Sequence, residues 1–262
     1  MSGLLKRVIV CLDVDNGHVV KGVNFVNLKK MGDPVALGAE YEKQGADELV
    51  FLDITASSEA RPTALDMVRR VSKTLSIPFT VGGGLRTVED IYAFLAAGAD
   101  KVALNTQAVL TPELIDEGAS QFGSQCIVVA VDTKKDADGI HRVYTHGGRQ
   151  AANRETVPWA RELVSRGVGE ILLTSMDRDG TGFGFDLSVT APLALELTVP
   201  VIASGGAESP EHLRIAFEAG ADAALAASMF HSGRYTIGET KRYLAAAGIP
   251  GLAGFPAELM VF

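Results

Sequence analysis

The sequence predicts an α/β protein with a (β/α)8 TIM barrel fold, built as one domain (1–262) from two half-barrels of about 1–122 and 123–262. The first observation is a repeat: the segment 77–106, IPFTVGGGLRTVEDIYAFLAAGADKVALNT, returns 122 residues later as VPVIASGGAESPEHLRIAFEAGADAALAAS. Each copy reads as a strand, a Gly-rich turn, an amphipathic helix and a second strand, which is a βαβ unit. The second observation is the length of 262 residues, which is common for such a barrel.

Apolar runs typical of parallel strands provide the third observation. They are apolar throughout rather than alternating, as expected for strands that are covered on both faces. In order, the runs cover 6–13, 48–54, two parts of 77–106, 126–132, 170–175 and two parts of 199–228. A doubly wound open sheet would also fit this alternation with helices. The repeat favours closure, because two four-stranded halves make an eight-stranded barrel.

Segments with helix start signals separate the apolar runs. The first helix opens at Asp33-Pro34, with Asp33 as the N-cap, and ends at Gly45. Further helices are predicted at 63–75, inside each copy of the repeat, after Thr111-Pro112-Glu113, at 154–166 and at 236–247. Two connections are longer: residues 14–31 alternate like a hairpin around Asp15-Asn16-Gly17, and residues 134–149 form a polar excursion.

The composition limits the classes of function. A net charge of −8 argues against a nucleic-acid partner, although it is compatible with a local basic pocket for a phosphorylated metabolite. The N-terminal segment lacks signal-peptide features, and no apolar run approaches the ~20 residues of a membrane span, so we expect no membrane partner. Cys11 and Cys126 lie in apolar runs, which indicates reduced thiols and a cytoplasmic protein. The five histidines have no metal-ligand spacing, and neither a metal nor a cofactor is expected.

The two Gly-rich turns are candidate phosphate-binding sites. Glycine lets the backbone approach a ligand closely, and the start of the following helix offers N–H groups to an anion. The candidate glycines are Gly83, Gly84, Gly205 and Gly206. Asn105 and Thr106 end the next strand of the first copy and could close the same pocket, as could Ser228 in the second copy. The alternative is that the glycines only make tight strand-to-helix turns.

Asp13 and Asp132 end the first and fifth predicted strands, at matching places in the two halves. The active site of such a barrel lies at the carboxyl ends of its strands, so the two carboxylates should face each other across the mouth. This pair suits general acid–base catalysis if one carboxyl is protonated and the other ionised. The alternative for either residue is a helix cap or a solvated loop side chain.

Other polar residues near the predicted mouth are candidates for substrate binding. Lys21, on the long connection after the first strand, could fold over a phosphorylated substrate, or it is a solvated surface lysine. Thr174 lies at the end of the sixth strand, and Asp179 and Gly180 belong to the polar loop 177–181 that follows. This loop could contact substrate or simply form the turn.

Four charged residues mark the starts of strands: Arg7, Glu48, Lys101 and Glu170. Each has the same alternation parity as the inward-facing candidates of its strand. Buried charges must pair, so we expect these side chains, two of each sign, to form a network at the barrel floor. A purely structural salt-bridge ring would account for such a network in any barrel.

A series of motifs carries a resemblance to a known family: VCLDVDNGHVVKG, ELVFLDITAS, FTVGGG, ADKVALNTQAV, VAVD, EILLTSMDRDGTGFGFD and IASGGA. Over about 6–230 the chain resembles the cyclase subunits of imidazole glycerol phosphate synthase, a lyase of histidine biosynthesis. The resemblance implies that Asp13 and Asp132 are catalytic and that the Gly-rich turns bind a ribulosyl-formimino carboxamide ribotide with a phosphate at each end. It implies further that ammonia attacks the ketose, the imidazole ring closes, and imidazole glycerol phosphate and aminoimidazole carboxamide ribotide leave.

The resemblance also implies a glutaminase subunit as partner in a heterodimer, with the four floor charges as a gate for ammonia. Neither Cys11 nor Cys126 looks like a glutaminase nucleophile, because no nucleophile elbow surrounds either residue. Two other functions stay open: the sister barrel that isomerises the preceding ribotide, and a non-catalytic barrel that binds sugar phosphates. Lys101, Glu48 and Glu170, with the LVFLDITAS and LLTSMDRDGT runs, resemble the cyclase.

Overall fold

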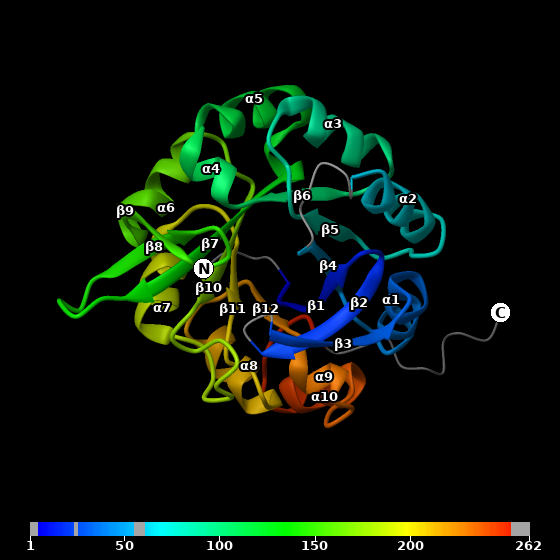
Figure 1. Cartoon of the computed structure of the whole chain (residues 1–262). Coiled ribbons are helices and arrows are strands. Elements are labelled where there is room, and N and C mark those ends of the chain that lie inside the picture. The colour runs from blue at the N-terminus through cyan, green and yellow to red at the C-terminus, as the bar shows by residue number, and fades with distance from the viewer. Residues whose placement is uncertain (1–4, 24–25, 55–60, 253–262) are drawn as a thin grey trace.

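The computed structural model describes residues 5–23, 26–54 and 61–252. Parallel strands close into a barrel in the order β1-β4-β5-β6-β7-β10-β11-β12, and β12 pairs back to β1. In Figure 1 these strands lie in the centre, with helices around them. The barrel strands are β1 (Arg7–Asp15), β4 (Glu48–Asp53), β5 (Phe79–Gly82), β6 (Lys101–Leu104), β7 (Ile127–Lys135), β10 (Glu170–Ser175), β11 (Val201–Ser204) and β12 (Ala223–Ala226). The predicted (β/α)8 barrel is confirmed.

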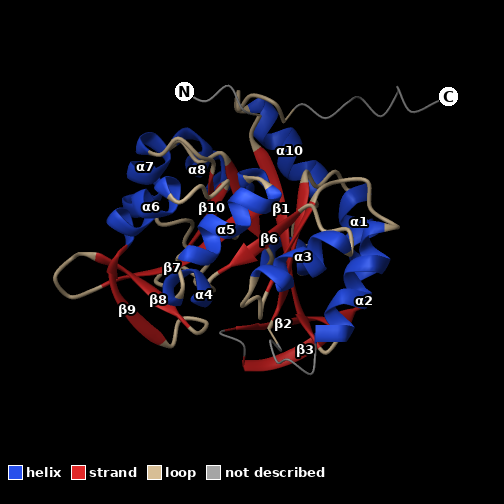
Figure 2. Cartoon of the chain, turned by 90° about the horizontal axis from the view of Figure 1, so that it is seen from above, coloured by secondary structure: helices blue, strands red, loops and turns tan. Residues whose placement is uncertain are grey.

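Helices cover the outside of the barrel, as Figure 2 shows in a view turned by 90° from that of Figure 1. They are α1 (Pro34–Lys43), α2 (Arg61–Ser72), α3 (Val88–Ala96), α4 (Thr106–Leu110), α5 (Glu113–Phe122), α6 (Thr156–Ser165), α7 (Leu187–Glu196), α8 (Pro210–Glu218), α9 (Ser228–His231) and α10 (Ile237–Ala246), with a 3-10 turn at Ser124–Cys126. The short helices α4 and α9 follow β6 and β12 at equivalent places of the two halves.

The first strand of each half continues beyond the barrel into an antiparallel hairpin. β1 turns at Asn16-Gly17, where φ is 48° and 76°, into β2 (His18–Val23) and β3 (Val26–Gly32). These angles suit the tight turn that the sequence predicted, and the hairpin is confirmed. β7 continues into β8 (His141–Thr145) and β9 (Gln150–Glu155).

The second hairpin corrects the expectation of a polar excursion over 134–149 and a helix from residue 154. Residues 150–155 pair with β8, and α6 begins only at Thr156. β8 buries Val143 and Thr145, and β9 buries no residue, so few apolar side chains mark these strands in the sequence. Instead, β8 pairs with the extension of β7, and β9 pairs with β8.

Inward-facing side chains form an apolar layer in the middle of the barrel, between charged residues at the strand starts and polar residues at the strand ends. This layer comprises Ile9, Cys11, Val50, Ala103, Val128, Leu172, Ile202, Ala223 and Leu225. The alternate residues of the same strands, such as Val8 and Val10, pack outward into the larger core beneath the helices. Closure of the barrel thus brings the ends of all strands to one mouth and their starts to one floor.

A Gly-Ala-Asp motif precedes three barrel strands and joins each to a neighbour. Its glycine ends the preceding helix with a positive φ, as at Gly45 (96°), Gly98 (109°) and Gly220 (107°). Its aspartate accepts a hydrogen bond from the backbone near the start of the adjacent strand. The bonds are Val8 N to Asp47 Oδ2 (2.7 Å), Phe79 N to Asp100 Oδ2 (2.9 Å) and Val201 N to Asp222 Oδ2 (3.1 Å).

Gly169 stands where the fourth copy of this motif, before β10, would have its aspartate. A Cβ at Gly169 would lie 2.0 Å from the backbone oxygen of Ser124. We therefore expect Gly169→Ala to lower the free energy of unfolding by about 3 kcal/mol or more. Gly238→Ala in α10, where the nearest atoms are 3.5 Å away, should change it by less than about 1 kcal/mol. Urea denaturation of both variants measures the difference, and equal stabilities would contradict the steric explanation.

Candidate active site

Asp13 and Asp132 lie at the carboxyl ends of β1 and β7, which are separated by three strands in either direction around the barrel. In the sheet register, Asp13 lies beside Leu52 of β4, and Asp132 lies beside Thr174 of β10. Both carboxyl groups are only partly exposed. The mouth therefore presents two carboxylates from equivalent positions of the two halves.

Burial raises the pKa of both Asp13 and Asp132 to about 6. For Asp13, the negative charge of Asp179 adds to the effect of burial. For Asp132, a hydrogen bond from Asn105 lowers the pKa and the charge of Asp179 raises it. A carboxyl group with a pKa near neutrality is accessible in either protonation state, which general acid–base catalysis requires.

Asp179 is a third carboxylate at the mouth, in the turn after β10. Two backbone N–H groups, of Arg178 and Asp179, donate to the Ser175 oxygen (3.2 and 2.9 Å) and hold this turn. The Asp179 side chain is open to solvent, yet the surrounding protein removes much of its hydration and raises its pKa, against a backbone hydrogen bond from Gly180. The sequence identified Asp179 only as a candidate substrate contact. Its charge acts on both Asp13 and Asp132, so three carboxylates share one site.

Asn105 connects β6 to Asp132. Its Nδ2 donates to Asp132 Oδ2 (3.1 Å) and to the Ala130 oxygen (3.2 Å). The sequence placed Asn105 and Thr106 at the end of a strand. In the structure the strand stops one residue earlier, because Asn105 (φ −128°, ψ −96°) turns the chain, and Thr106 begins α4. Thr106 Oγ1 accepts from His146 N (2.8 Å) and donates to Asn105 Oδ1 (3.2 Å), so the β8–β9 turn is linked to Asp132.

The two Gly-rich turns have conformations that glycine adopts easily and other residues do not. Gly83 and Gly84 have φ of 107° and 68°, and Gly205 and Gly206 have φ of 92° and 96°. A Cβ at Gly83 would lie 2.2 Å from the backbone oxygen of Asp53, and one at Gly206 would lie 2.4 Å from a backbone oxygen of the β10–α7 loop. The turns therefore need glycine for their own packing, whether or not a ligand binds there.

The helix start after the first turn differs from the sequence expectation. α3 begins further along the chain, and Thr87 and Asp90 cap its N-terminus as a capping box. The short helices α4 and α9 start directly after β6 and β12, and the side chains of their N-cap residues, Asn105 and Ala227, make no capping hydrogen bond. Ser228, the first residue of α9, is exposed. The second turn leads to α8, whose N-cap Ser209 makes no side-chain capping hydrogen bond, and α4 and α9 add two further helix starts after neighbouring strands.

Four charged side chains, which we call the floor ring, close the amino end of the barrel: Arg7, Glu48, Lys101 and Glu170. Lys101 Nζ donates to both oxygens of Glu48 (3.0 and 2.9 Å) and to Glu170 Oε2 (2.9 Å). Arg7 donates to Glu48 Oε2 (2.7 Å) and to Glu170, and Thr80 donates to Glu48 Oε1 (2.8 Å). The side chains of Glu48 and Glu170 are only 2% and 6% exposed, so water solvates them little. Arg7 and Lys101, which each pair with both glutamates, balance their negative charges instead.

The chain is similar to histidine-biosynthesis proteins along most of its length. The protein family described as "Histidine biosynthesis protein" matches residues 7–236. The imidazole glycerol phosphate synthase subunit HisF of Geobacillus kaustophilus is 59% identical over 248 residues, which cover 94% of this chain and 98% of the relative. The chain belongs to the HisF family. The subunit HisF of Gluconacetobacter diazotrophicus is 56% identical over 244 residues, covering 93% of this chain and 95% of the relative.

HisF membership settles the choice between the functions that the sequence left open. The chain is of the cyclase type, a lyase of histidine biosynthesis, and not the sister isomerase. The resemblance drawn from the motifs is thereby confirmed. Residues 55–57, which end the motif LVFLDITAS, lie outside the residues that the structure describes.

The remaining candidates of the HisF site occupy different parts of the mouth. Thr174 lies between Asp132 and Ser204 in the sheet register, and Gly180 (φ 71°) lies in the turn after β10. Lys21 is in β2, opposite Lys29, and its side chain lies outside what the structure describes.

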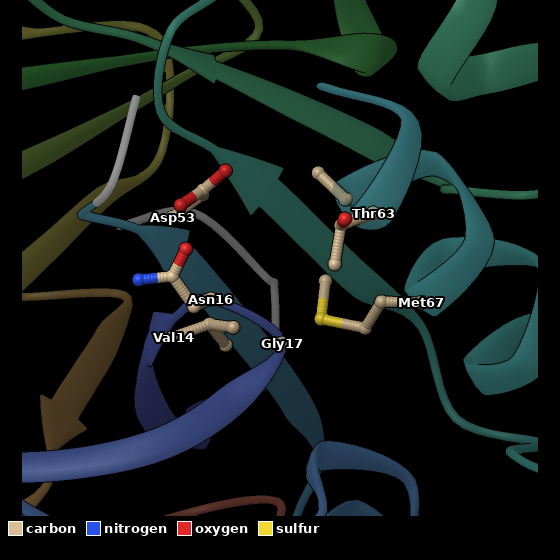
Figure 3. Close-up of a pocket in the computed structure, with 7 residues that line it drawn as sticks. Val14, Asn16, Gly17, Asp53, Thr63 and Met67 are labelled. Atoms are coloured by element: carbon tan, nitrogen blue, oxygen red, sulfur yellow. The ribbon is translucent and has the colours of Figure 1, made fainter. Parts of the chain in front are cut away.

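A small cavity that sequence reasoning did not find lies under the β1–β2 turn (Figure 3). Its lining comes from the end of β1, that turn, the end of β4 and α2, namely Val14, Asn16, Gly17, Asp53, Thr63, Ala64 and Met67. No sequence pattern marks it, because it forms only where the turn packs on the helix.

Over 5–23, 26–54 and 61–252 no group of His, Cys, Asp and Glu could hold a metal ion. No helix in these ranges is long and apolar enough to cross a membrane.

We expect Asn105→Ala to raise the pKa of Asp132 above about 6, since the hydrogen bond that favours the charged carboxylate is lost. The pKa of Asp13, which has no bond to Asn105, should stay where it is. Carboxyl 13C NMR titration of the folded variant measures both groups. A lower pKa for Asp132, or an equal rise in both groups, would contradict the assignment.

Proposed function

We propose that the barrel mouth binds a ribulosyl-formimino carboxamide ribotide with a phosphate at each end, and converts it with ammonia into imidazole glycerol phosphate and aminoimidazole carboxamide ribotide. The pair Asp13 and Asp132 carries this proposal. Both residues come from equivalent places in the two half-barrels, and burial raises the pKa of both to about 6. Ring closure with ammonia needs successive proton transfers, which such a pair can provide.

In the proposed mechanism one of the two carboxyl groups is protonated and the other is ionised. The protonated group donates to the ketose oxygen while ammonia adds, and the ionised group accepts a proton from the attacking nitrogen. The charge of Asp179 disfavours ionisation of both Asp13 and Asp132 at once. The protons therefore belong to the three carboxylates as a coupled set, whose apparent pKa values a pH–rate profile would report.

The repeat suits a substrate with a phosphate at each end. Each half provides a Gly-rich turn and, at the next strand end, the start of a short helix, where backbone N–H groups bind anions. Asn105 and Thr106 would serve one phosphate and Ser228 the other. Lys21, Thr174, Asp179 and Gly180 would complete the site.

We propose that ammonia comes from a glutaminase subunit that forms a heterodimer with this chain. Cys11 is buried in the middle of β1 and burial raises the pKa of its thiol, while Cys126 ends the 3-10 turn before β7, so neither suits a nucleophile. The substrate would fill the mouth, which leaves the floor for ammonia. In this proposal the floor ring is the gate, and small inward residues such as Ala103 and Ala223 line the way to the mouth.

An ammonium-dependent assay on the purified chain tests the proposal. We expect the bisphosphorylated ribulosyl substrate and an ammonium salt to give both products without any glutaminase. Isomerisation of the preceding ribotide in place of cyclisation would contradict the proposal. Tight binding of the substrate without turnover would do so as well, since it would identify a sugar-phosphate-binding barrel.

A further inference from the structure

His231 links helix α1 to the strand that carries Asp13. It is the last residue of α9, and its Nε2 lies 2.9 Å from the backbone oxygen of Cys11, two residues before Asp13. Its Nδ1 lies 2.5 Å from the hydroxyl of Tyr41 on α1, and the two ring centroids are 5.5 Å apart. A chain of hydrogen bonds therefore runs from α1 through α9 to β1.

The bond from His231 lies at a gap between two ladders of the sheet. β12 pairs with β1 only as far as Val10, and β2 pairs with β1 only from Asp13. Cys11 lies between these ladders. Arg7 N bonds toward β12 whereas Val8 O bonds toward β4, so the backbone groups of successive residues face opposite sides of β1. Cys11 is four residues after Arg7, and its oxygen therefore faces the β12 side. A buried carbonyl group at such a gap needs another donor, and His231 provides it.

The other half-barrel has the same gap and closes it with a different residue. The ladder between β6 and β7 ends at the residue before Ala130. The oxygen of Ala130 accepts a hydrogen bond from Asn105 (3.2 Å). In both halves, a side-chain N–H thus binds the carbonyl group two residues before the aspartate of the mouth. Ala227, the counterpart of Asn105 in the repeat, has no polar side chain. His231 supplies on β1 the donor that Ala227 lacks.

The partners of His231 determine which of its nitrogens carries the proton. A carbonyl oxygen only accepts, so Nε2 is the donor to Cys11, and Nδ1 of the neutral ring accepts from the Tyr41 hydroxyl. Burial, with the charge of Glu40, raises the pKa of Tyr41 to about 12, so this hydroxyl keeps its proton near neutrality. The Cys11 oxygen thus sets the tautomer, and the Tyr41 hydroxyl, which can donate, matches it.

We propose that His231 is a positioning residue for Asp13, because it holds the Cys11 carbonyl group and so fixes the end of β1 at the mouth. The inference rests on the proposed function of Asp13 in proton transfer. Within the described residues, the carboxylate of Asp132 receives a side-chain bond from Asn105. That of Asp13 receives only a long contact from the Cys11 thiol (4.0 Å). Asp13 therefore depends on its own backbone for its position, and a small displacement of a catalytic group can cost up to ~10²-fold in rate.

The test compares three variants of the full chain. His231→Phe keeps a ring but removes both hydrogen bonds. His231→Gln retains a donor for the Cys11 oxygen and an acceptor for the Tyr41 hydroxyl. Ser232→Ala is the control, since its hydroxyl donates to the oxygen of Met229 in the same helix end. The measurements are kcat and KM with an ammonium salt, thermal unfolding, and carboxyl 13C NMR titration.

We expect His231→Phe to lower kcat about 10-fold or more while KM changes by less than about threefold. The pKa of Asp13 should fall from about 6 toward its ordinary value, because a loosened strand end admits water, and that of Asp132 should not change. His231→Gln should recover kcat to within about threefold of the wild type, and Ser232→Ala should match it.

An unchanged Asp13 titration together with a kcat within twofold of the wild type in folded His231→Phe would overturn the inference. Equal impairment of His231→Gln and His231→Phe would also overturn it. If His231→Phe does not fold, Tyr41→Phe replaces it: kcat and the pKa of Asp13 should both fall, and no change in either rejects the link. Asp13→Asn in the same assay separates the two proposals, since activity there would refute the function of Asp13 itself.

Discussion

Replacement of Asp13 or Asp132 by asparagine is expected to reduce ammonium-dependent cyclisation by about 10²–10⁴-fold. Asparagine preserves the size of the side chain but cannot exchange a proton, and both positions lie at strand ends on the mouth. Steady-state kinetics with an ammonium salt measure the loss. Asp66→Asn, an exposed change on α2, is the matched control and should keep wild-type activity. Turnover within threefold of the wild type in either mouth variant would refute the function proposed for that residue.

The same two variants should be more stable than the wild type at neutral pH. The pKa of each carboxyl group is raised to about 6 by burial, so between about pH 4 and 6 the folded state binds more protons than the unfolded state. Stability of the wild type therefore falls as the pH rises through this window. Each asparagine removes a cost on the order of 1–3 kcal/mol at pH 7, and the gain should vanish near pH 4. Thermal unfolding at pH 4 and pH 7 measures it, and lower stability of the variants at pH 7 would contradict the buried-charge explanation.

Lys101→Met is expected to uncouple glutamine-driven synthesis from ammonium-driven synthesis. Lys101 bonds both glutamates of the floor ring, and without it Arg7 is the one charged partner that Glu48 and Glu170 share among the described residues. The unbalanced buried charge should lower the free energy of unfolding by about 2–4 kcal/mol, less than for a fully buried pair because Lys101 is partly exposed. If the ring gates ammonia, synthesis with the glutaminase partner and glutamine falls, while turnover with an ammonium salt persists.

A charge-balanced double variant separates the gate from the structural contribution of the ring. Lys101→Met with Glu170→Gln leaves one Arg7–Glu48 pair, with Thr80 still bonded to Glu48, and should recover much of the lost stability. A gate defect should persist in this stable protein, since the lysine is still missing. Equal loss of both activities, or a change in stability with neither activity altered, would leave only a structural function for the ring.

Local patterns in the sequence determined the framework of this protein. Apolar runs and the 122-residue repeat predicted the barrel, because strand periodicity and helix start signals depend on residues close together in the chain. Alternation within strands also assigned faces. Once the barrel closes, equal parity brings Arg7, Glu48, Lys101 and Glu170 to one floor, where their predicted pairing is present. The same logic places Asp13 and Asp132 at the mouth.

Only the tertiary structure decided which polar groups meet. Asn105 bonds Asp132 across 27 residues, and His231 bonds the Cys11 oxygen across 220 residues, at gaps set by where each ladder of the sheet ends. Periodicity gives the face of a strand on which a residue lies, but a hydrogen bond needs a distance near 3 Å and a defined angle. The β8–β9 hairpin was not predicted for a related reason: β8 is held by pairing with β7 and β9 by pairing with β8, and little apolar burial marks either strand in the sequence.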